Sequence, residues 1–269
     1  MGNFIITYSA IILYFACAAL LFFQTKQPAS SAVRLSKKHI VLFGFGGLCL
    51  HGLALYQGMT TPLGINLGFY NAIALVSAFI TLFILIAVWR HPVEILAQIV
   101  LPITAITLLL NVNGDTSHLL PQESSKALIF HILSSIIAYS ILALAALQAV
   151  FLSIQNKLLH AHQPGGIIRL MPPLRNMEAL LFEVIIVGFI ALTISLGSGL
   201  LFLENMFAQQ LAHKTILSIL AWFVFLILLI GHWKLGWRGR TAIRWTLTGF
   251  VSLMLAYFGS KFVLEVVLA

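Results

Sequence analysis

The segment from Leu67 to Arg90 reads LGFYNAIALVSAFITLFILIAVWR, and its last residue is the only charged one. As a helix, a segment of this length is about 36 Å long, whereas the hydrocarbon core of a bilayer is about 30 Å thick. An apolar run that exceeds the bilayer core is typical of a transmembrane helix. This segment therefore predicts a membrane protein.

Seven further apolar runs flank this one along the 269-residue chain. We expect helices over residues 3–24, 39–58, 67–90, 94–113, 126–155, 178–203, 214–233 and 242–264. Hydrophobic residues make up 61% of the chain and charged residues 8%, which a water-soluble domain of this length does not tolerate on its surface. The predicted fold is all-α, a polytopic membrane helix bundle with eight transmembrane helices, in which residues 1–269 form a single transmembrane domain.

The basic residues indicate how these helices cross the membrane. Twelve of the fifteen Lys and Arg residues fall in the connections after the first, third, fifth and seventh predicted helices. Because Lys and Arg accumulate in cytoplasmic loops, both termini are expected outside the cytoplasm. The same pattern accounts for the net charge of +8, so no nucleic-acid partner is expected.

Several motifs are absent from the sequence. The two cysteines, Cys17 and Cys49, belong to no C-x-x-C or C-x-x-C-H motif, which excludes a disulfide relay and a c-type cytochrome. There is no nucleotide-binding glycine loop, and no carboxylate pair lies at one predicted depth, so neither hydrolysis nor phosphoryl transfer is expected. Small residues are expected instead where helices approach closely, at Gly44, Gly46, Gly47, Gly64, Gly68, Gly197 and Gly199.

Nine histidines are the most informative polar residues, and their predicted depth separates them. Four lie in or beside cytoplasmic loops, where a solvated imidazole is ordinary: His39, His91, His160 and His162. His131 follows Lys126 by five residues, and His51 precedes the loop near Gly58 by seven. Both are therefore expected about 8 to 11 Å from the outer ends of their helices. These two histidines share a predicted level in the membrane.

His118 and His213 are predicted at the outer surface, so four histidines gather toward the outer leaflet. A neutral imidazole can ligate iron through one ring nitrogen while the other donates a hydrogen bond. His131 and His51 could thus hold the iron of a haem b between them. Alternatively, each bonds only to a backbone carbonyl or a serine of a neighbouring helix. His232, near the cytoplasmic end of its helix, is either an interfacial anchor or part of a second, inner site.

Five segments share a further pattern: His131 with Tyr139 eight residues later, Lys214 to Trp222, Gly236 to Gly239, Tyr257 to Gly259, and Pro62 with Asn66 and Tyr70. Together they resemble segments of the CcsA-type cytochrome c assembly membrane proteins, which handle haem. The likeness covers most of the chain from about residue 47 onward. Within that family, the chain is most similar to the shorter YpjD-type proteins of the bacterial inner membrane.

The resemblance implies a haem site near the outer face. The family's residue at the position of His131 is an external axial ligand, Trp222 matches the last tryptophan of a tryptophan-rich signature, and His232 falls two positions from an inner-membrane histidine. The first part of the signature and a second external histidine are absent here, so His51 or His213 would supply the missing nitrogen. The predicted cofactor-binding residues are His131, His51, His213, His232, Trp222 and Tyr139.

The expected function is haem binding or haem handling related to cytochrome c assembly, by a multi-pass inner-membrane protein that is not an enzyme. Membrane lipid and other membrane proteins of cytochrome assembly or transport are the expected partners. The alternative is a permease-like or accessory subunit of a transport system that keeps the fold without haem, with Glu183 and Lys261 as parts of a polar path. A purely structural partner of another membrane protein is a third possibility.

Overall fold

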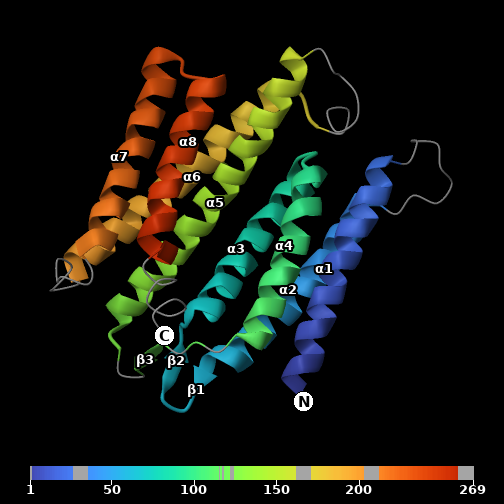
Figure 1. The fold of residues 1–269 in the computed structure, drawn as a ribbon, viewed down its shortest axis with the longest axis vertical. Helices are drawn as coiled ribbons and strands as arrows, with labels where there is room; N and C mark the ends of the chain where they lie inside the picture. Colours follow the sequence, from blue (N-terminus) through green and yellow to red (C-terminus); the bar gives the residue numbers. More distant parts are fainter. Residues whose placement is uncertain are drawn as a thin grey trace. The chain divides into compact units, whose positions relative to one another are not determined.

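A computed structural model (Figure 1) describes residues 2–26, 36–114, 116, 118–121, 124–161, 171–202 and 212–259. The helices are α1 (Gly2–Lys26), α2 (Lys37–Met59), α3 (Phe69–Arg90), α4 (Glu94–Asn113), α5 (Lys126–His160), α6 (Leu174–Phe202), α7 (Ala212–Leu235) and α8 (Gly239–Met254). A π-helical turn, η2 (Leu255–Gly259), continues α8, and three strands are β1 (Thr60–Thr61), β2 (Gly64–Asn66) and β3 (Leu119–Pro121). The predicted all-helical class is confirmed.

Seven of the described helices are long and apolar enough to cross a membrane. The exception is α8, which has 16 residues and carries two arginines in its first two turns. Its start differs from the predicted one because Gly239, with a φ of 55°, turns the chain into the helix three residues early. Residues 260–264, the predicted end of this span, lie outside the described residues. The count of eight spans and the orientation of the termini stay predictions.

The chain divides into two compact units, Met1–Gln122 and Glu123–Ala269. In the first, α1 and α3 each pack against both α2 and α4, so the four helices close into a ring. In the second, α5 and α7 each pack against both α6 and α8, which gives the same ring order. Within each unit, consecutive helices run in opposite directions (Figure 1). The predicted single domain over residues 1–269 stays a prediction.

The small sheet belongs to the first unit and was not predicted. Its strands are antiparallel in the order β1-β2-β3, with Thr60 opposite Ile65 and Ile65 opposite Leu120. Strands of two or three residues are too short to show the alternation of apolar and polar residues that indicates a strand in a sequence. The sheet nevertheless joins the loop before α3 to the segment after α4.

Small residues bring helices together at some of the predicted positions. A Cβ atom at Gly44 would lie 2.7 Å from Leu85 Cδ2, and one at Gly47 would lie 3.1 Å from Tyr14 Cε1. The prediction is wrong for Gly197, where nothing lies within 4 Å of the added Cβ. The neighbouring Ser198 faces α5 instead, where its Oγ lies 3.2 Å from Nδ1 of His131.

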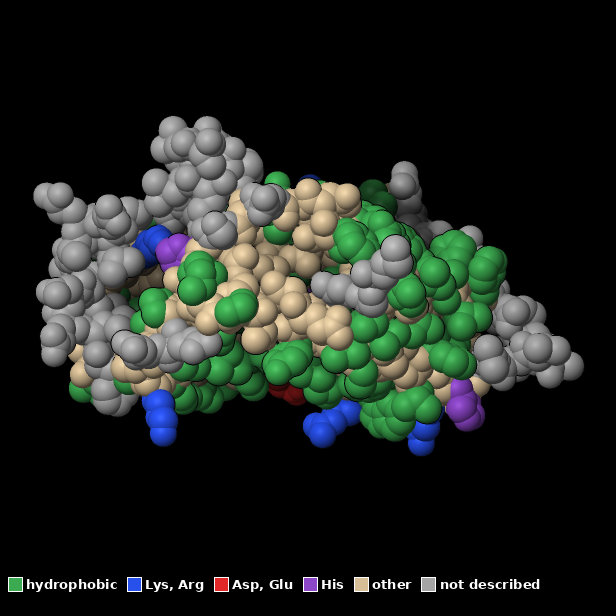
Figure 2. Space-filling model, turned by 90° about the horizontal axis from the view of Figure 1, so that it is seen from below, with side chains coloured by type: hydrophobic (Ala, Val, Ile, Leu, Met, Phe, Trp, Pro, Cys, Tyr) green, Lys and Arg blue, Asp and Glu red, His purple; other side chains and the backbone are tan. Residues whose placement is uncertain are grey.

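Large apolar side chains are exposed on both units. Ile12 is 66% exposed in the first, and Leu201 is 78% exposed in the second. Figure 2 shows hydrophobic side chains over large parts of one face, with charged side chains only at scattered points. Exposed apolar helix faces of this kind require lipid as their solvent. Together with the seven long apolar helices, they define a multi-pass membrane protein.

Candidate functional site

His131 lies in the second turn of α5, and its half-buried ring is turned toward α6. Its Nδ1 is 3.0 Å from the carbonyl oxygen of Ser195 and 3.2 Å from Ser198 Oγ. Because a carbonyl oxygen can only accept, Nδ1 carries the proton and donates it to Ser195. The lone pair of the neutral ring is then on Nε2. No residue in the described ranges forms a hydrogen bond with that nitrogen.

Four serines contact this histidine or its partners: Ser134 and Ser135 of α5, and Ser195 and Ser198 of α6. Ser198 Oγ donates to the Ser195 carbonyl at 2.8 Å, and Ser135 Oγ donates to the His131 carbonyl at 2.7 Å. The Ser135 proton is thereby used, so the Ser195 hydroxyl donates to Ser135 Oγ at 2.6 Å. These contacts match the alternative considered from the sequence, in which the histidine bonds to a backbone carbonyl or a serine of a neighbouring helix. The same type of contact also orients histidines that ligate metals.

Tyr139 is buried in an aromatic cluster on another face of α5. Its ring centroid is 5.4 Å from that of Phe250, 5.6 Å from Tyr257 and 5.3 Å from Phe258. Two of the five segments singled out in the sequence therefore meet here. Eight residues separate Tyr139 from His131, which is about 12 Å along the helix. The two side chains face different helices, α8 and α6.

Trp222 joins α7 to α6. Its Nε1 donates to Thr193 Oγ1 at 2.9 Å, and its ring stacks on Phe189 at a centroid distance of 5.4 Å. Thr193 and Ser195 are two residues apart on α6, so they share a level but point about 160° apart around the helix. Trp222 and His131 thus contact different faces of α6.

His232 lies near the end of α7 and has the same hydrogen-bond pattern as His131. Its Nδ1 is 3.0 Å from the Trp237 carbonyl oxygen, so Nδ1 donates and the lone pair is on Nε2. Its ring stacks on Phe182, with centroids 3.5 Å apart and planes 16° apart. Phe182 and Ser195 are 13 residues apart on α6, which is about 20 Å. His232 and His131 therefore mark two separate places in the second unit.

The turn after α7 is fixed by Glu178 of α6, which the sequence did not single out. Glu178 Oε1 accepts a hydrogen bond from the backbone N–H of Gly239 at 2.9 Å. A carboxylate at the first turn of a helix also interacts favourably with the helix dipole. This contact positions Trp237, whose carbonyl holds His232.

His51 belongs to the first unit and is fully buried. Its Nδ1 is 3.1 Å from the hydroxyl oxygen of Tyr14, which is also fully buried. The backbone of Ala74 also faces the ring, but Nε2 forms no hydrogen bond within the described part of the chain. An iron atom could reach this nitrogen only if the surrounding side chains moved. The role of His51 as a ligand, and its pairing with His131 in the other unit, stay predictions.

Two further histidines, His118 and His213, were predicted at the outer surface. His213 lies in the first turn of α7, but its side chain is outside the described residues. His118 is exposed beside β3, where its backbone N–H donates to Asn66 Oδ1 at 3.1 Å.

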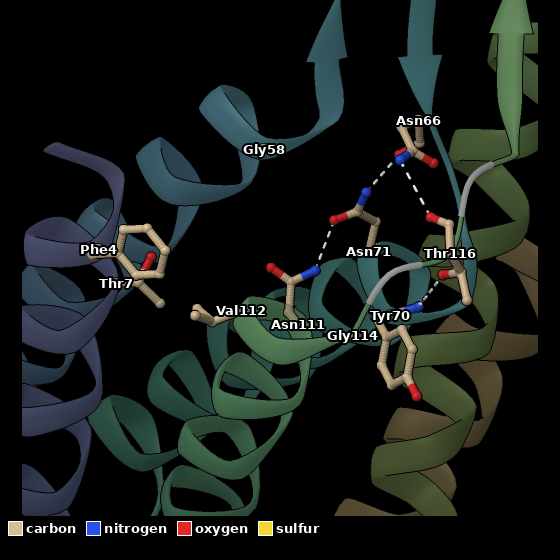
Figure 3. Close-up of a pocket in the computed structure, with 10 residues that line it drawn as sticks. All are labelled: Phe4, Thr7, Gly58, Asn66, Tyr70, Asn71, Asn111, Val112, Gly114 and Thr116. Atoms are coloured by element: carbon tan, nitrogen blue, oxygen red, sulfur yellow. Dashed lines mark hydrogen bonds between the residues drawn. The ribbon is translucent and has the colours of Figure 1, made fainter. Parts of the chain in front are cut away.

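A polar pocket of about 190 Å³ lies in the first unit (Figure 3). Three asparagines form a chain beside it: Asn111 Nδ2 donates to Asn71 Oδ1 at 2.7 Å, and Asn71 Nδ2 donates to the Asn66 carbonyl at 3.1 Å. Asn66 Oδ1 also accepts from the N–H of Gly68 at 2.9 Å, which starts α3. The backbone N–H of Tyr70 donates to Thr116 Oγ1 at 3.4 Å. Asn66 and Tyr70, which resemble family residues, therefore hold together the corner before α3. The pocket is too small for a porphyrin.

The donor set nevertheless fits haem. The described residues contain no group of three or more His, Cys, Asp or Glu side chains that could hold a metal ion alone. A haem iron does not need one, because the porphyrin fills four positions and the protein supplies only axial ligands. A single oriented imidazole such as that of His131 is therefore sufficient to start such a site.

The fold and the site together define a class: a multi-pass helical membrane protein in which backbone carbonyls orient histidine rings between packed helices. The chain belongs to the cytochrome c assembly protein family, whose model matches residues 39–268. It is 34% identical to the inner membrane protein YpjD of Escherichia coli over 209 residues, which are 76% of this chain and 77% of that protein.

Two further relatives are more distant. The chain is 33% identical to an uncharacterized 28.8 kDa protein of Azospirillum brasilense over 51% of this chain and 52% of that protein. It is 28% identical to the cytochrome c biogenesis protein CcsA of Chlamydomonas reinhardtii over 56% of this chain and 42% of that protein. No solved structure matches. The family resemblance expected from the sequence is confirmed.

Proposed function

We propose that this protein handles haem in cytochrome c assembly, in the bacterial inner membrane, and that His131 is an axial ligand of the haem iron. The hydrogen bond from His131 Nδ1 to the Ser195 carbonyl carries the proposal, because it leaves Nε2 with an available lone pair. Family membership and the similarity to a cytochrome c biogenesis protein support the same function. Neither name refers to transport, so the permease-like alternative is not favoured.

A bound haem b would supply a redox-active iron. The residues of the chain would supply the axial nitrogen and fix its orientation through Ser195 and Ser198. The second axial nitrogen is assigned, as in the sequence prediction, to His51 or His213. Trp222 and Tyr139 contact other helix faces than His131, so their part in the site would be to hold α7 against α6 and α8 against α5. His232 would serve a second, inner site, since its Nδ1 is also committed to a backbone carbonyl. We assign the protein to binding and transfer of haem, not to enzymatic catalysis.

We also propose that the chain crosses the membrane eight times with both termini outside the cytoplasm. The helix α8 and the turn η2 together cover Gly239–Gly259, 16 plus 5 residues. A length of 21 residues is what a membrane span requires. The twelve Lys and Arg residues in alternate predicted connections and in the helix turns beside them support the orientation.

The haem content of the purified protein tests the proposal. The full chain, purified in detergent after supplementation with haem, should show Soret absorption. His131→Ala should lose this absorption, whereas Ser198→Ala, which keeps the backbone acceptor, should weaken haem binding by about tenfold at most. His160→Ala is a matched control. His160 lies at the other end of α5, is exposed, and also bonds through Nδ1 to a carbonyl, that of Asn156.

Added imidazole should restore Soret absorption to His131→Ala, because it replaces the missing nitrogen. His51→Ala and His213→Ala, measured in the same way, identify the second ligand by which of them lowers haem content. A wild-type sample without Soret absorption after supplementation contradicts the proposal. So does a His131→Ala protein with unchanged haem content.

A further inference from the structure

We propose that a basic groove between α5 and α8 binds the headgroup of an anionic phospholipid. The groove is lined by Ser153, Asn156 and Lys157 of α5 and by Arg240, Ile243 and Arg244 of α8. Its volume is about 360 Å³, and all of its lining belongs to the second unit. Arg240 and Arg244 are four residues apart, so they lie on one face of α8.

The three cations of the groove have no acidic partner in the described ranges. The described acidic residues of the second unit are Glu178, which accepts a hydrogen bond from Gly239, and the exposed Glu183. Neither lines the groove, and the one ion pair among the described residues is that of Lys37 with Glu94 in the first unit. The adjacent connection, residues 162–170, contains no Asp or Glu. The groove therefore has positive charge that an external anion can balance.

The groove lies at the level of lipid headgroups. Lys157 follows His131 by 26 residues on the same helix, which is about 39 Å. The hydrocarbon core is about 30 Å thick, so the turns around Lys157 extend beyond it when the apolar part of α5 spans the core. Arg240 and Arg244 lie in the first two turns of α8, which packs against α5. Their long side chains can reach the headgroup layer.

Apolar side chains continue from the groove toward the membrane interior. Val150 lies two turns before Lys157 on the same face of α5 and is 40% exposed. Ile154, three residues before Lys157, is 41% exposed. Ile243 lines the groove itself. A headgroup bound by the cations would therefore place its acyl chains along an apolar surface.

The side chains select a phosphate diester. Two guanidinium groups can each form paired hydrogen bonds with phosphate oxygens, and the Lys157 ammonium adds a third charge. The hydroxyl of Ser153 and the amide of Asn156 can bond to the glycerol oxygens of a headgroup. Basic pockets between membrane helices are known to bind anionic lipids such as cardiolipin. A zwitterionic lipid would bring its own cation into a positive groove and is disfavoured.

Lipid retention measured by native mass spectrometry tests this assignment. The full chain is reconstituted in phosphatidylcholine bilayers with and without cardiolipin, then released in neutral detergent. We expect wild-type protein to retain cardiolipin over phosphatidylcholine. Each basic residue near the surface contributes about fivefold in affinity, so Arg240→Gln with Arg244→Gln should weaken cardiolipin binding by about 30-fold. Circular dichroism in neutral detergent checks that this variant remains folded.

Lys234→Gln with Arg238→Gln is the matched control, because it removes the same charge from the last turn of α7 and the turn before α8, and neither residue lines the groove. This control should retain cardiolipin like the wild type. Equal loss in both double variants would overturn the assignment, since it indicates non-specific attraction. Equal thermal stabilisation by inorganic phosphate alone would also overturn it. A groove variant that loses haem but keeps cardiolipin would assign the groove to the carboxylates of haem instead.

Discussion

Tyr14 and His51 form a buried hydrogen-bonded pair, so the effect on stability of replacing them singly and together can be predicted. Tyr14→Phe removes the hydroxyl and leaves the imidazole without any hydrogen bond, because Nε2 has none within the described residues. His51→Leu leaves the Tyr14 hydroxyl buried without its partner. Each single substitution should lower the free energy of unfolding by about 1 to 3 kcal/mol, the cost of an unpaired buried polar group.

The double variant removes both polar groups and should cost less than the sum of the two single changes. Hydrogen bonds between membrane helices show coupling energies of about 0.6 to 1.7 kcal/mol in such cycles, and we expect a value in this range. Reversible unfolding in mixed micelles, followed by circular dichroism, measures it. Tyr8→Phe is the control: Tyr8 is 45% exposed on the same helix, so its change should stay within about 0.5 kcal/mol.

Additive single effects would refute this reasoning. A coupling energy below about 0.3 kcal/mol, the usual limit for independent sites, would mean that the pair contributes no net stabilisation. Haem content of the same samples separates structure from ligation. If His51 were an axial ligand, His51→Leu would lose haem, whereas Tyr14→Phe, which keeps the imidazole, would only weaken haem binding.

Two further substitutions test how the helices and the corner before α3 are built. Gly188→Ala should lower the free energy of unfolding by about 1 to 3 kcal/mol, because its Cβ would lie 2.6 Å from Cδ2 of the fully buried Leu142. Gly197→Ala, with open space around the Cβ, should instead stabilise the helix by up to about 1 kcal/mol; the same micelle unfolding assay compares the two, and equal signs would contradict the packing. Asn66→Ala removes the acceptor of two backbone N–H groups and should cost about 2 kcal/mol, whereas Asn113→Ala, which affects an exposed bond within its own helix, should cost less than about 0.5 kcal/mol.

The helices were predictable because each is an apolar run of membrane length, and this signal does not depend on tertiary packing. Their ends were less predictable. The helix α5 continues to His160, five residues past the predicted end, because polar residues such as Asn156 and Lys157 remain helical beyond the apolar run that ends near Gln155. Gln155 is buried there and donates to the Pro172 carbonyl at 2.8 Å. A contact between positions 17 residues apart leaves no periodic pattern in the sequence.

The candidate site was predictable in its residue types but not in its partners. The sequence singled out His131 by depth and by its spacing to Tyr139, and it allowed a serine or a carbonyl as the histidine's partner. It did not identify Ser195, because that choice depends on how α5 and α6 are rotated against one another. The pairing of Tyr139 with Tyr257 depends on packing in the same way. The spacing of residues along the chain does not determine how α6 or the turn after α8 is rotated against α5.

The proton on His131 Nδ1 has a consequence for how the ring can react inside a membrane. Burial disfavours a charged imidazolium, and the Ser195 carbonyl holds the single proton of the neutral ring on Nδ1, so the ring would meet an electrophile as an uncharged Lewis base. Coordination of a metal by Nε2 would then release no hydrogen ion. In a medium without water to accept it, an expelled hydrogen ion would have nowhere favourable to go. Because the Ser195 carbonyl keeps the proton on Nδ1, Nε2 could bind a metal without any proton having to leave the helix bundle.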